Sequence, residues 1–272
     1  MICRNIRTTS AAPRDRNFFL NLINNAAALT QLNQAHAQLI INGLHNDLIT
    51  VTKLTHKLSD LNAIHQASLL CSTFPKPDLF LFNVLIRGFS RNSSPSSAIL
   101  LYTHIRRNTR LKPDNFTYAF AISASSGLSN EGTGLLLHAH SILDGFGSDV
   151  FVGSAVVDSY LKFSRVGLAR KVFDGMLERD TVLWNTMISG LVRNCCFSES
   201  IQVFGDMVSM GTQFDSTTLA AVLPAVAELQ ELRVGMEIQS LAWKLTTEAT
   251  FNVSEGEQRI ALLSLAKQAH EV

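Results

Sequence analysis

Apolar residues recur with helical spacing twice within residues 180–215, and a short polar stretch separates the two patterns. The first pattern has apolar residues at i, i+3, i+4, i+7 and i+8, one face of an α-helix: Trp184, Met187, Ile188, Leu191 and Val192. The second follows Ser198, a good N-cap, and ends near Gly211, a common type of helix terminator. A connection of about five residues predicts an antiparallel helical hairpin. Because a lone hairpin cannot bury its apolar faces, we expect neighbouring hairpins to cover them.

This hairpin is one unit of a longer repeat. Moving the sequence against itself by 102 residues aligns identical residues at several positions: His36 with His138, Asn83 with Asn185, Ile86 with Ile188, and Gly88 with Gly190. Within each block, aspartates recur at intervals of 31 to 36 residues: Asp47, Asp78, Asp114, Asp149, Asp180 and Asp215. A period in the thirties is typical of a stacked helical solenoid, in which each unit contacts its neighbours.

We therefore predict an all-α fold, a right-handed α-solenoid of stacked antiparallel helical hairpins, over residues 13–245. Its units are expected at 13–47, 48–78, 79–114, 115–149, 150–180, 181–215 and 216–245. Nearly all residues of the apolar stripes are predicted to form the core. The recurring aspartate has two interpretations, because it can cap the following helix or carry a function that repeats once per unit.

Composition and charge exclude several classes of function. The chain has 272 residues, 46% hydrophobic and 17% charged, with a net charge of +1, so no global basic field attracts nucleic acid. The four cysteines, Cys3, Cys71, Cys195 and Cys196, lack zinc-site or disulfide spacing, which predicts free thiols. No apolar run approaches the roughly 20 residues of a membrane span, so we expect no membrane partner. Phosphate-binding loops and nucleophile elbows are missing too, and we predict no enzyme activity, catalytic residue, metal or cofactor.

The first sixteen residues differ from the rest, because they contain four arginines, several hydroxyl residues and a single acid. This composition is typical of an organelle transit peptide, although a frayed basic terminus is the alternative. We expect the transit segment over about residues 1–12, and a mitochondrial location before a chloroplast one, since arginine outweighs serine.

Several segments resemble the pentatricopeptide repeat (PPR) family. Residues 81–89 and 183–191 are similar to its first-helix signature, residues 150–180 to its short repeat, and residues 134–146 to its long repeat. The order of long, short and standard repeats resembles the PLS class of plant organelle RNA-editing factors. The resemblance implies binding of single-stranded organellar RNA, about one nucleotide per repeat, with bases exposed for edge and face contacts.

The resemblance also implies which side chains contact RNA. In the family, the fifth and last residues of a repeat choose the base, and the second residue stacks on it. On this chain, the resemblance implies that the base-choosing pairs are Thr52 with Asp78, Asn83 with Asp114, Ser154 with Asp180, and Asn185 with Asp215. The stacking residues are Ile49, Phe80, Phe151 and Val182. By the family's code the bases read G, U, a weakly read base, G and U, since Ala119 with Asp149 offers no selective hydrogen bond.

The carboxyl-terminal part departs from the family's editing factors, because the E and DYW regions are missing. A zinc deaminase needs His-x-Glu with Cys-x-x-Cys, and neither is present, so His138 is predicted to be a packing residue. Any editing would then require a deaminase-bearing partner in trans. Residues 246–272 are expected to be a non-repeat tail, either a capping helix or the end of a truncated editing factor. The alternative functions are a protein-interaction scaffold that binds no RNA, and a truncated inactive product.

Overall fold

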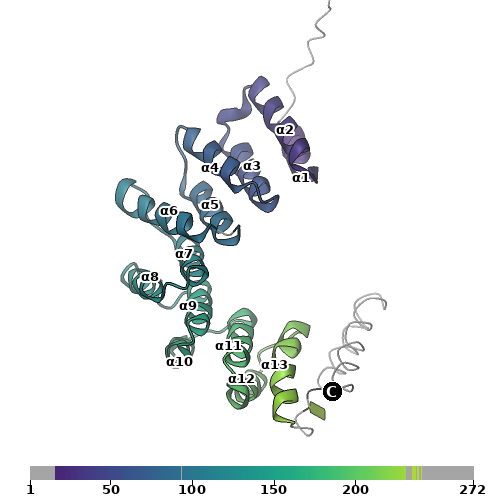
Figure 1. Ribbon diagram of the computed structural model, residues 1–272, viewed down its shortest axis with the longest axis vertical. Coiled ribbons are helices and arrows are strands. Elements are labelled where there is room, and N and C mark those ends of the chain that lie inside the picture. The colour runs from purple at the N-terminus through teal and green to yellow at the C-terminus, as the bar shows by residue number, and fades with distance from the viewer. Residues whose placement is uncertain (1–15, 93, 231–234, 237, 239, 241–272) are drawn as a thin grey trace, which may run out of the picture. The chain divides into compact units, whose positions relative to one another are not determined.

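The computed structural model describes residues 16–92, 94–230, 235, 236, 238 and 240. Over these residues the chain forms thirteen α-helices and one short 3-10 helix, and no β-strand (Figure 1). The predicted transit segment and the predicted tail lie outside the described residues. No helix in the described ranges is long and apolar enough to cross a membrane. The chain divides after Leu128 into two compact units, each of which contains several of the repeats.

The first unit contains seven α-helices and the 3-10 helix η1. Their bounds are α1 Arg16–Asn25, α2 Leu29–Ile41, η1 Leu44–Asn46, α3 Leu48–Asp60, α4 Ile64–Thr73, α5 Leu79–Arg91, α6 Pro95–Asn108 and α7 Asn115–Gly127. The second unit contains six, which are α8 Glu131–Leu143, α9 Val150–Lys162, α10 Val166–Gly175, α11 Thr181–Arg193, α12 Phe197–Ser209 and α13 Ser216–Leu229. Most are 13 or 14 residues long, which is three to four turns.

Each unit has two layers of helices (Figure 1). In the first unit, α1, α3, α5 and α7 contact one another in chain order, and α2, α4 and α6 cover them. In the second unit, α9, α11 and α13 form the corresponding row, covered by α8, α10 and α12. We call the rows α1-α3-α5-α7 and α9-α11-α13 the first-helix rows. Because α4, α6, α10 and α12 contact both the preceding and the following first helix, the predicted α-solenoid of stacked hairpins is confirmed.

Apolar side chains from both layers form a continuous core within each unit. Trp184 and Ile188 of α11 are at most 2% exposed, as the periodicity predicts. The Trp184 ring meets Phe173 of α10 edge to face at 4.9 Å, and the Arg179 guanidinium lies 4.9 Å from the Phe173 centroid. Such contacts join consecutive hairpins, so the core of one repeat is completed by the next.

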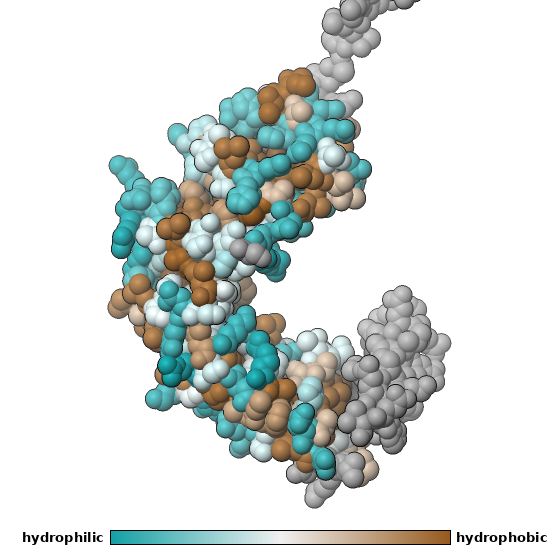
Figure 2. Space-filling view, viewed as in Figure 1, coloured by the Kyte–Doolittle hydropathy of each residue, from teal (hydrophilic) through white to brown (hydrophobic). Residues whose placement is uncertain are grey.

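Two details differ from the sequence-based expectation. Ser198 is not the N-cap of α12, because the Cys196 amide bonds to the Leu191 carbonyl at 2.9 Å and the helix begins at Phe197. The helical spacing of Ile99, Leu100 and Ile105 predicts an apolar stripe on α6, but Leu100 is 70% exposed, since Ala98, Tyr102 and Ile105 form the buried face of that helix. Figure 2 shows other apolar side chains mixed with polar ones on the visible surface.

Two glycines explain part of the 102-residue match, because they sit where first helices touch. A Cβ on Gly88 would lie 2.5 Å from Ser59 Oγ and 2.7 Å from Ile64 Cδ1. A Cβ on Gly190 would lie 2.9 Å from Leu161 Cγ and 3.0 Å from Leu161 Cβ. Only a residue without a Cβ permits this approach of α5 to α3 and of α11 to α9.

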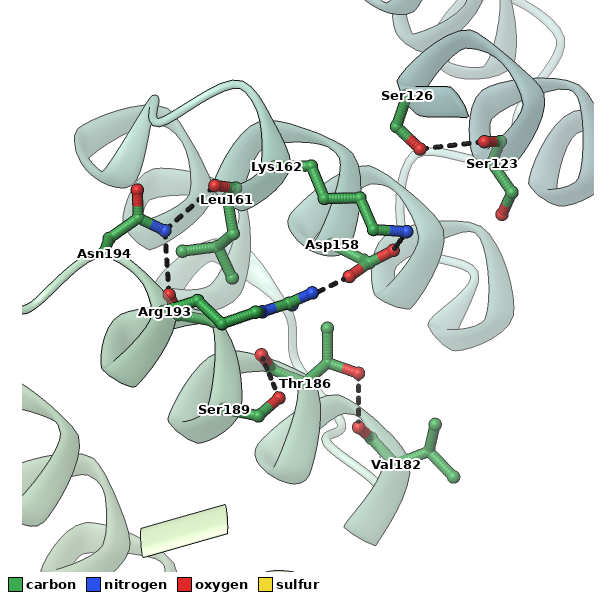
Figure 3. Close-up of polar contacts among 11 residues, drawn as sticks. Ser123, Ser126, Asp158, Leu161, Lys162, Val182, Thr186, Ser189, Arg193 and Asn194 are labelled. Atoms are coloured by element: carbon green, nitrogen blue, oxygen red, sulfur yellow. Dashed lines mark hydrogen bonds and ion pairs between the residues drawn. The ribbon is translucent and has the colours of Figure 1, made fainter. Parts of the chain in front are cut away.

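An asparagine near the end of each of these helices fixes the same contact. Asn92 Nδ2 donates to the carbonyls of Gly88 at 2.8 Å and Ser59 at 3.2 Å. Asn194 Nδ2 donates to the carbonyls of Gly190 at 2.8 Å and Leu161 at 2.9 Å (Figure 3). Each amide thereby satisfies a carbonyl at the end of the preceding first helix, and it holds two neighbouring repeats together.

Candidate functional site

The six periodic aspartates all cap first helices. Each carboxylate accepts the backbone N–H three residues on, at 2.8 to 3.0 Å. The capped helices are α3, α5, α7, α9, α11 and α13, which follow Asp47, Asp78, Asp114, Asp149, Asp180 and Asp215. The capping interpretation is therefore confirmed. Because each cap also ends the preceding repeat, the carboxylate lies where two repeats meet.

Two of these carboxylates also bind an asparagine of the preceding first helix. Asn83 Nδ2 donates to Asp114 Oδ1 at 2.9 Å, and Asn185 Nδ2 donates to Asp215 Oδ1 at 3.4 Å. The same two Oδ1 atoms accept the backbone N–H of Thr117 and Thr218 at 2.8 and 2.9 Å. The structure therefore joins the two residues within each of two predicted base-choosing pairs, out of four. Their asparagines are 102 residues apart in the sequence, and their aspartates are 101 residues apart.

The two asparagines differ in their remaining contact. The Thr117 hydroxyl lies 2.7 Å from Asn83 Oδ1 and 2.8 Å from Asp114 Oδ1, and its single proton serves one acceptor at a time. Asn83 is accordingly buried, at 4% exposed. Asn185 is half-buried, and its Oδ1 is shielded from solvent without a hydrogen-bond partner among the described residues. A buried acceptor of this kind costs free energy until a donor reaches it.

The carboxylate of Asp215 is held in its charged form. Burial alone would raise the pKa of Asp215, but hydrogen bonds from Thr218, Asn185 and the Thr217 amide outweigh it. The pKa of Asp215 therefore lies below its ordinary value. At neutral pH this carboxylate remains a hydrogen-bond acceptor toward Asn185.

The two hydroxyl pairs are arranged differently. No hydrogen bond joins Thr52 to Asp78 or Ser154 to Asp180 within the described part of the chain. Thr52 is 7% exposed, and Ser154 Oγ is buried without a partner there. Beside Asp78, burial and the charge of that carboxylate raise the pKa of the Cys71 thiol to about 11, so Cys71 stays protonated.

The predicted stacking residues lie on the surface. Ile49, Phe80, Phe151 and Val182 are each the second residue of a first helix, and they are 44 to 66% exposed. Core packing therefore does not account for them. Phe116 occupies the same position in α7 and is 49% exposed. Phe116 was not among the predicted stacking residues, although it follows Asp114 by two residues, as Phe80 follows Asp78.

Charged side chains cross between α9 and α11 farther along the same helices (Figure 3). Asp158 accepts from Lys162 at 2.7 Å and from Arg193 of α11 at 3.1 Å. Figure 3 shows both cations pointing toward this carboxylate, with Thr186 and Ser189 on the neighbouring turns of α11. Two cations share one acid, which leaves a local excess of one positive charge. Because Lys162 and Arg193 are about half exposed, ion pairs of this type add little stability.

His138 is a packing residue, as predicted. His138 Nδ1 lies 2.8 Å from the Tyr160 hydroxyl, and the rings meet edge to face at 5.6 Å. Burial lowers the pKa of His138 and raises that of Tyr160, so both remain neutral at pH 7. Across the residues with described placement, no group of three or more His, Cys, Asp or Glu side chains is arranged to hold a metal ion.

Sequence comparison identifies the repeats. The family described as PPR repeat matches residues 80–108 and 182–212. A pentatricopeptide repeat-containing protein of Arabidopsis thaliana is 50% identical over 237 residues, which cover 87% of this chain and 30% of that protein. A second one from the same plant is 34% identical over 242 residues, 88% of this chain and 35% of its own length. The chain thus spans about a third of the length of these relatives.

Structure comparison gives the same fold. A crystal structure of the pentatricopeptide repeat protein PPR10, determined in complex with an 18-nucleotide psaJ RNA element, superposes with a TM-score of 0.64. The match covers 89% of this chain and 36% of PPR10, at 15% sequence identity.

Proposed function

The chain belongs to the pentatricopeptide repeat family, and from this premise we propose that it is a sequence-selective single-stranded RNA-binding protein of an organelle. Support comes from the relatives, which carry the same repeats, and from PPR10, whose structure was determined with bound RNA. The observation that carries the proposal is the amide–carboxylate hydrogen bond that recurs at Asn83–Asp114 and Asn185–Asp215. Core packing does not require this polar pair at the joint between two repeats.

The recurring pair suits a pyrimidine with one imide N–H, which is uracil. At Asn185 the carboxylate of Asp215 orients the amide through one N–H, so the amide carbonyl remains as an acceptor for the uracil N3–H. Asn185 Oδ1, which is buried and lacks a donor, is the acceptor that a uracil would satisfy. Since this atom is covered in the free protein, RNA binding turns the Asn185 side chain outward. Thr52 and Ser154 are assigned guanine, so the bases follow the order G, U, any base, G and U.

The exposed second residues supply contact with the base faces. Ile49, Phe80, Phe151 and Val182 each follow a capping aspartate by two residues, and for Phe80 and Val182 that aspartate, Asp78 or Asp180, belongs to a base-choosing pair. Stacking of a base on an aromatic or apolar side chain is worth about 1–3 kcal/mol. Affinity therefore comes mainly from stacking of the bases on these second residues, and base selectivity comes from the base-choosing pairs.

The finer role we propose is RNA editing or another RNA-processing step, with catalysis supplied in trans by a deaminase-bearing partner. The order of repeat types, which resembles the PLS class, supports this assignment. The arginine-rich first residues support import into mitochondria. Chloroplast import is the alternative, and a relative 28% identical over 87% of this chain and 29% of its own length is named as chloroplastic.

Binding of the full chain to short RNAs tests the proposal. A labelled RNA with the order G-U-N-G-U inside an unstructured flank should bind, and its affinity should fall as salt rises, because phosphate contacts release counterions. A protein-interaction scaffold, the alternative that the net charge of +1 favours, would show neither binding nor a salt slope. Absence of RNA binding at low salt would therefore overturn the proposal.

Base selection is tested by exchanging one pair residue. Asn83→Thr should move the preferred base at the second position from U toward G or A, while the fifth position stays U. Asn185→Thr, the matched control, should change the fifth position and leave the second unchanged. Each exchange should alter discrimination roughly three- to tenfold, since one hydrogen bond contributes about 0.5–1.5 kcal/mol. Unchanged selectivity in both variants would contradict the assignment of the pairs.

A further inference from the structure

The first unit contains a cavity of about 510 Å³ between α2 and α4, and buried residues of α3 form its floor. We call this space the α2–α4 cavity. His36 of α2 lines it, is half-buried, and has no hydrogen-bond partner among the residues that the structure describes. The volume lies in the range of protein sites for small organic molecules. The apolar part of the lining includes Leu32, Leu54, Leu58, Leu70 and Phe74.

The second unit shows what occupies the corresponding space 102 residues later. His138 corresponds to His36, and Tyr160 corresponds to Leu58. His138 Nδ1 lies 2.8 Å from the Tyr160 hydroxyl, and the two rings meet edge to face. Leu58 lines the α2–α4 cavity but has neither an aromatic ring nor a hydroxyl group. The first unit therefore has the histidine without the phenol that pairs with it in the second unit.

A second polar link between the same elements is also specific to the second unit. Arg165 donates to Glu131 through Nε at 2.7 Å and through Nη2 at 3.1 Å, which ties α8 to the N-cap residue of α10. The corresponding residues of the first unit are Ala63 and Leu29, which cannot form an ion pair. Neither of these two links has to break when a ligand enters beside α2.

We propose that the α2–α4 cavity binds a small organic molecule that carries a phenol group. The aromatic ring lies against Leu58, where the second unit has the Tyr160 ring, and the phenol hydroxyl forms a hydrogen bond with His36. Burial lowers the pKa of His36, so its imidazole is neutral at pH 7 and one ring nitrogen accepts the hydroxyl proton. Apolar cavities take up aromatic rings, and a buried hydroxyl needs such a partner. The lining also contains amides that suit a polar substituent on the ring: Asn33, Asn46 and Gln66.

Binding of 4-methylphenol to the full chain tests the proposal, because this compound reproduces the tyrosine side chain. In a titration followed by the NMR signals of the histidine rings, the His36 signals should shift and reach saturation. The dissociation constant should be about 1 mM for a ligand of this size. The signals of His56, a histidine outside the cavity that pairs with Asp60, should not move.

Toluene, which has the same ring and methyl group but no hydroxyl, tests the hydrogen bond. The quantity to compare is the ratio of the toluene dissociation constant to that of 4-methylphenol, because the different hydration of the two compounds cancels between protein variants. In His36→Leu this ratio should fall about three- to tenfold, since the variant removes the acceptor of the hydroxyl proton.

Two matched variants test where the ring lies. Leu58→Tyr supplies a ring and a hydroxyl from the chain itself, and it should weaken binding of 4-methylphenol roughly tenfold or more. Tyr160→Leu makes the opposite change in the second unit. It removes the phenol beside His138 and should create a second site, so that two molecules bind per chain. Circular dichroism of each variant checks that the helices are retained.

Saturable binding that shifts the His36 signals and is weakened in Leu58→Tyr would support the proposal. No saturable binding, the same affinity in Leu58→Tyr, or a single bound molecule per chain in Tyr160→Leu would overturn it. A toluene ratio unchanged in His36→Leu would mean that the cavity accepts any apolar ring, which would overturn the phenol assignment. None of these outcomes bears on the proposed RNA binding, because no base-choosing or stacking residue lines the α2–α4 cavity.

Discussion

Gly190→Ala is expected to separate two first helices that touch. Gly190 faces Leu161 across the contact between α11 and α9, and an added Cβ would meet the Cβ, Cγ and Cδ1 atoms of that leucine. Leu161 is 2% exposed and is itself surrounded by the core, so it cannot swing away without displacing its neighbours. The substitution therefore shifts α11, which carries Asn185, away from α9.

Two effects of opposite sign determine how much Gly190→Ala changes the free energy of unfolding. Insertion of a methyl group into a well-packed contact costs about 1–3 kcal/mol. Replacement of glycine by alanine within a helix stabilises the folded state by about 1 kcal/mol, because alanine loses less backbone entropy on folding. The net expectation is a loss of about 1 kcal/mol in the free energy of unfolding, or a melting temperature about 2–4 °C lower for a chain of this size.

Gly205→Ala is the matched control, because Gly205 lies within α12 and a Cβ there meets nothing within 4 Å. The free energy of unfolding of Gly205→Ala should rise by about 0.5–1 kcal/mol through the same entropy effect. Thermal and urea unfolding of both variants, followed by far-ultraviolet circular dichroism, measures the difference in unfolding free energy. If Gly190→Ala proved as stabilising as Gly205→Ala, the close contact between α9 and α11 would be refuted.

Two further predictions address the cap and the buried histidine. Asp180→Ala should cost about 1 kcal/mol of stability through loss of the cap on α11, while Asp180→Asn should cost far less, because asparagine caps equally well; equal losses in urea titrations would show that the cap is unimportant. Burial lowers the pKa of His138 below its value of about 6.5 in the unfolded chain, so stability should be full above that pH and fall as pH drops through it. His138→Gln should flatten this part of the pH profile, and an unchanged profile would mean that another group is responsible.

The sequence predicted the fold in considerable detail, because two periodic signals coincide. The stripe that contains Trp184 and Ile188 identified the buried face of α11, and the aspartates marked where first helices begin. Both signals are local: a cap needs only its own helix, and an apolar stripe needs only its own spacing. Leu100 shows the limit, since a helical stripe does not reveal how wide its buried part is.

The candidate site was less predictable, because it depends on contacts between repeats. The sequence indicated Asn83 and Asp114 as a pair, but not that Thr117 joins them and that Asn83 is buried. Likewise, His138 and Tyr160 are 22 residues apart, and only the packing of α8 on α9 makes them neighbours. Their contact depends on the spacing of two helices, which no single-helix pattern encodes.

The most direct test of the account is selection of RNA by the full chain from a random single-stranded pool. The account predicts enrichment of G-U-N-G-U with the third position unselected, and loss of U at the second position when Asn83→Thr is used in the same selection. Recovery of no enriched motif, or of a motif that Asn83→Thr and Asn185→Thr both leave unchanged, would contradict the claim that these amide–carboxylate pairs read RNA.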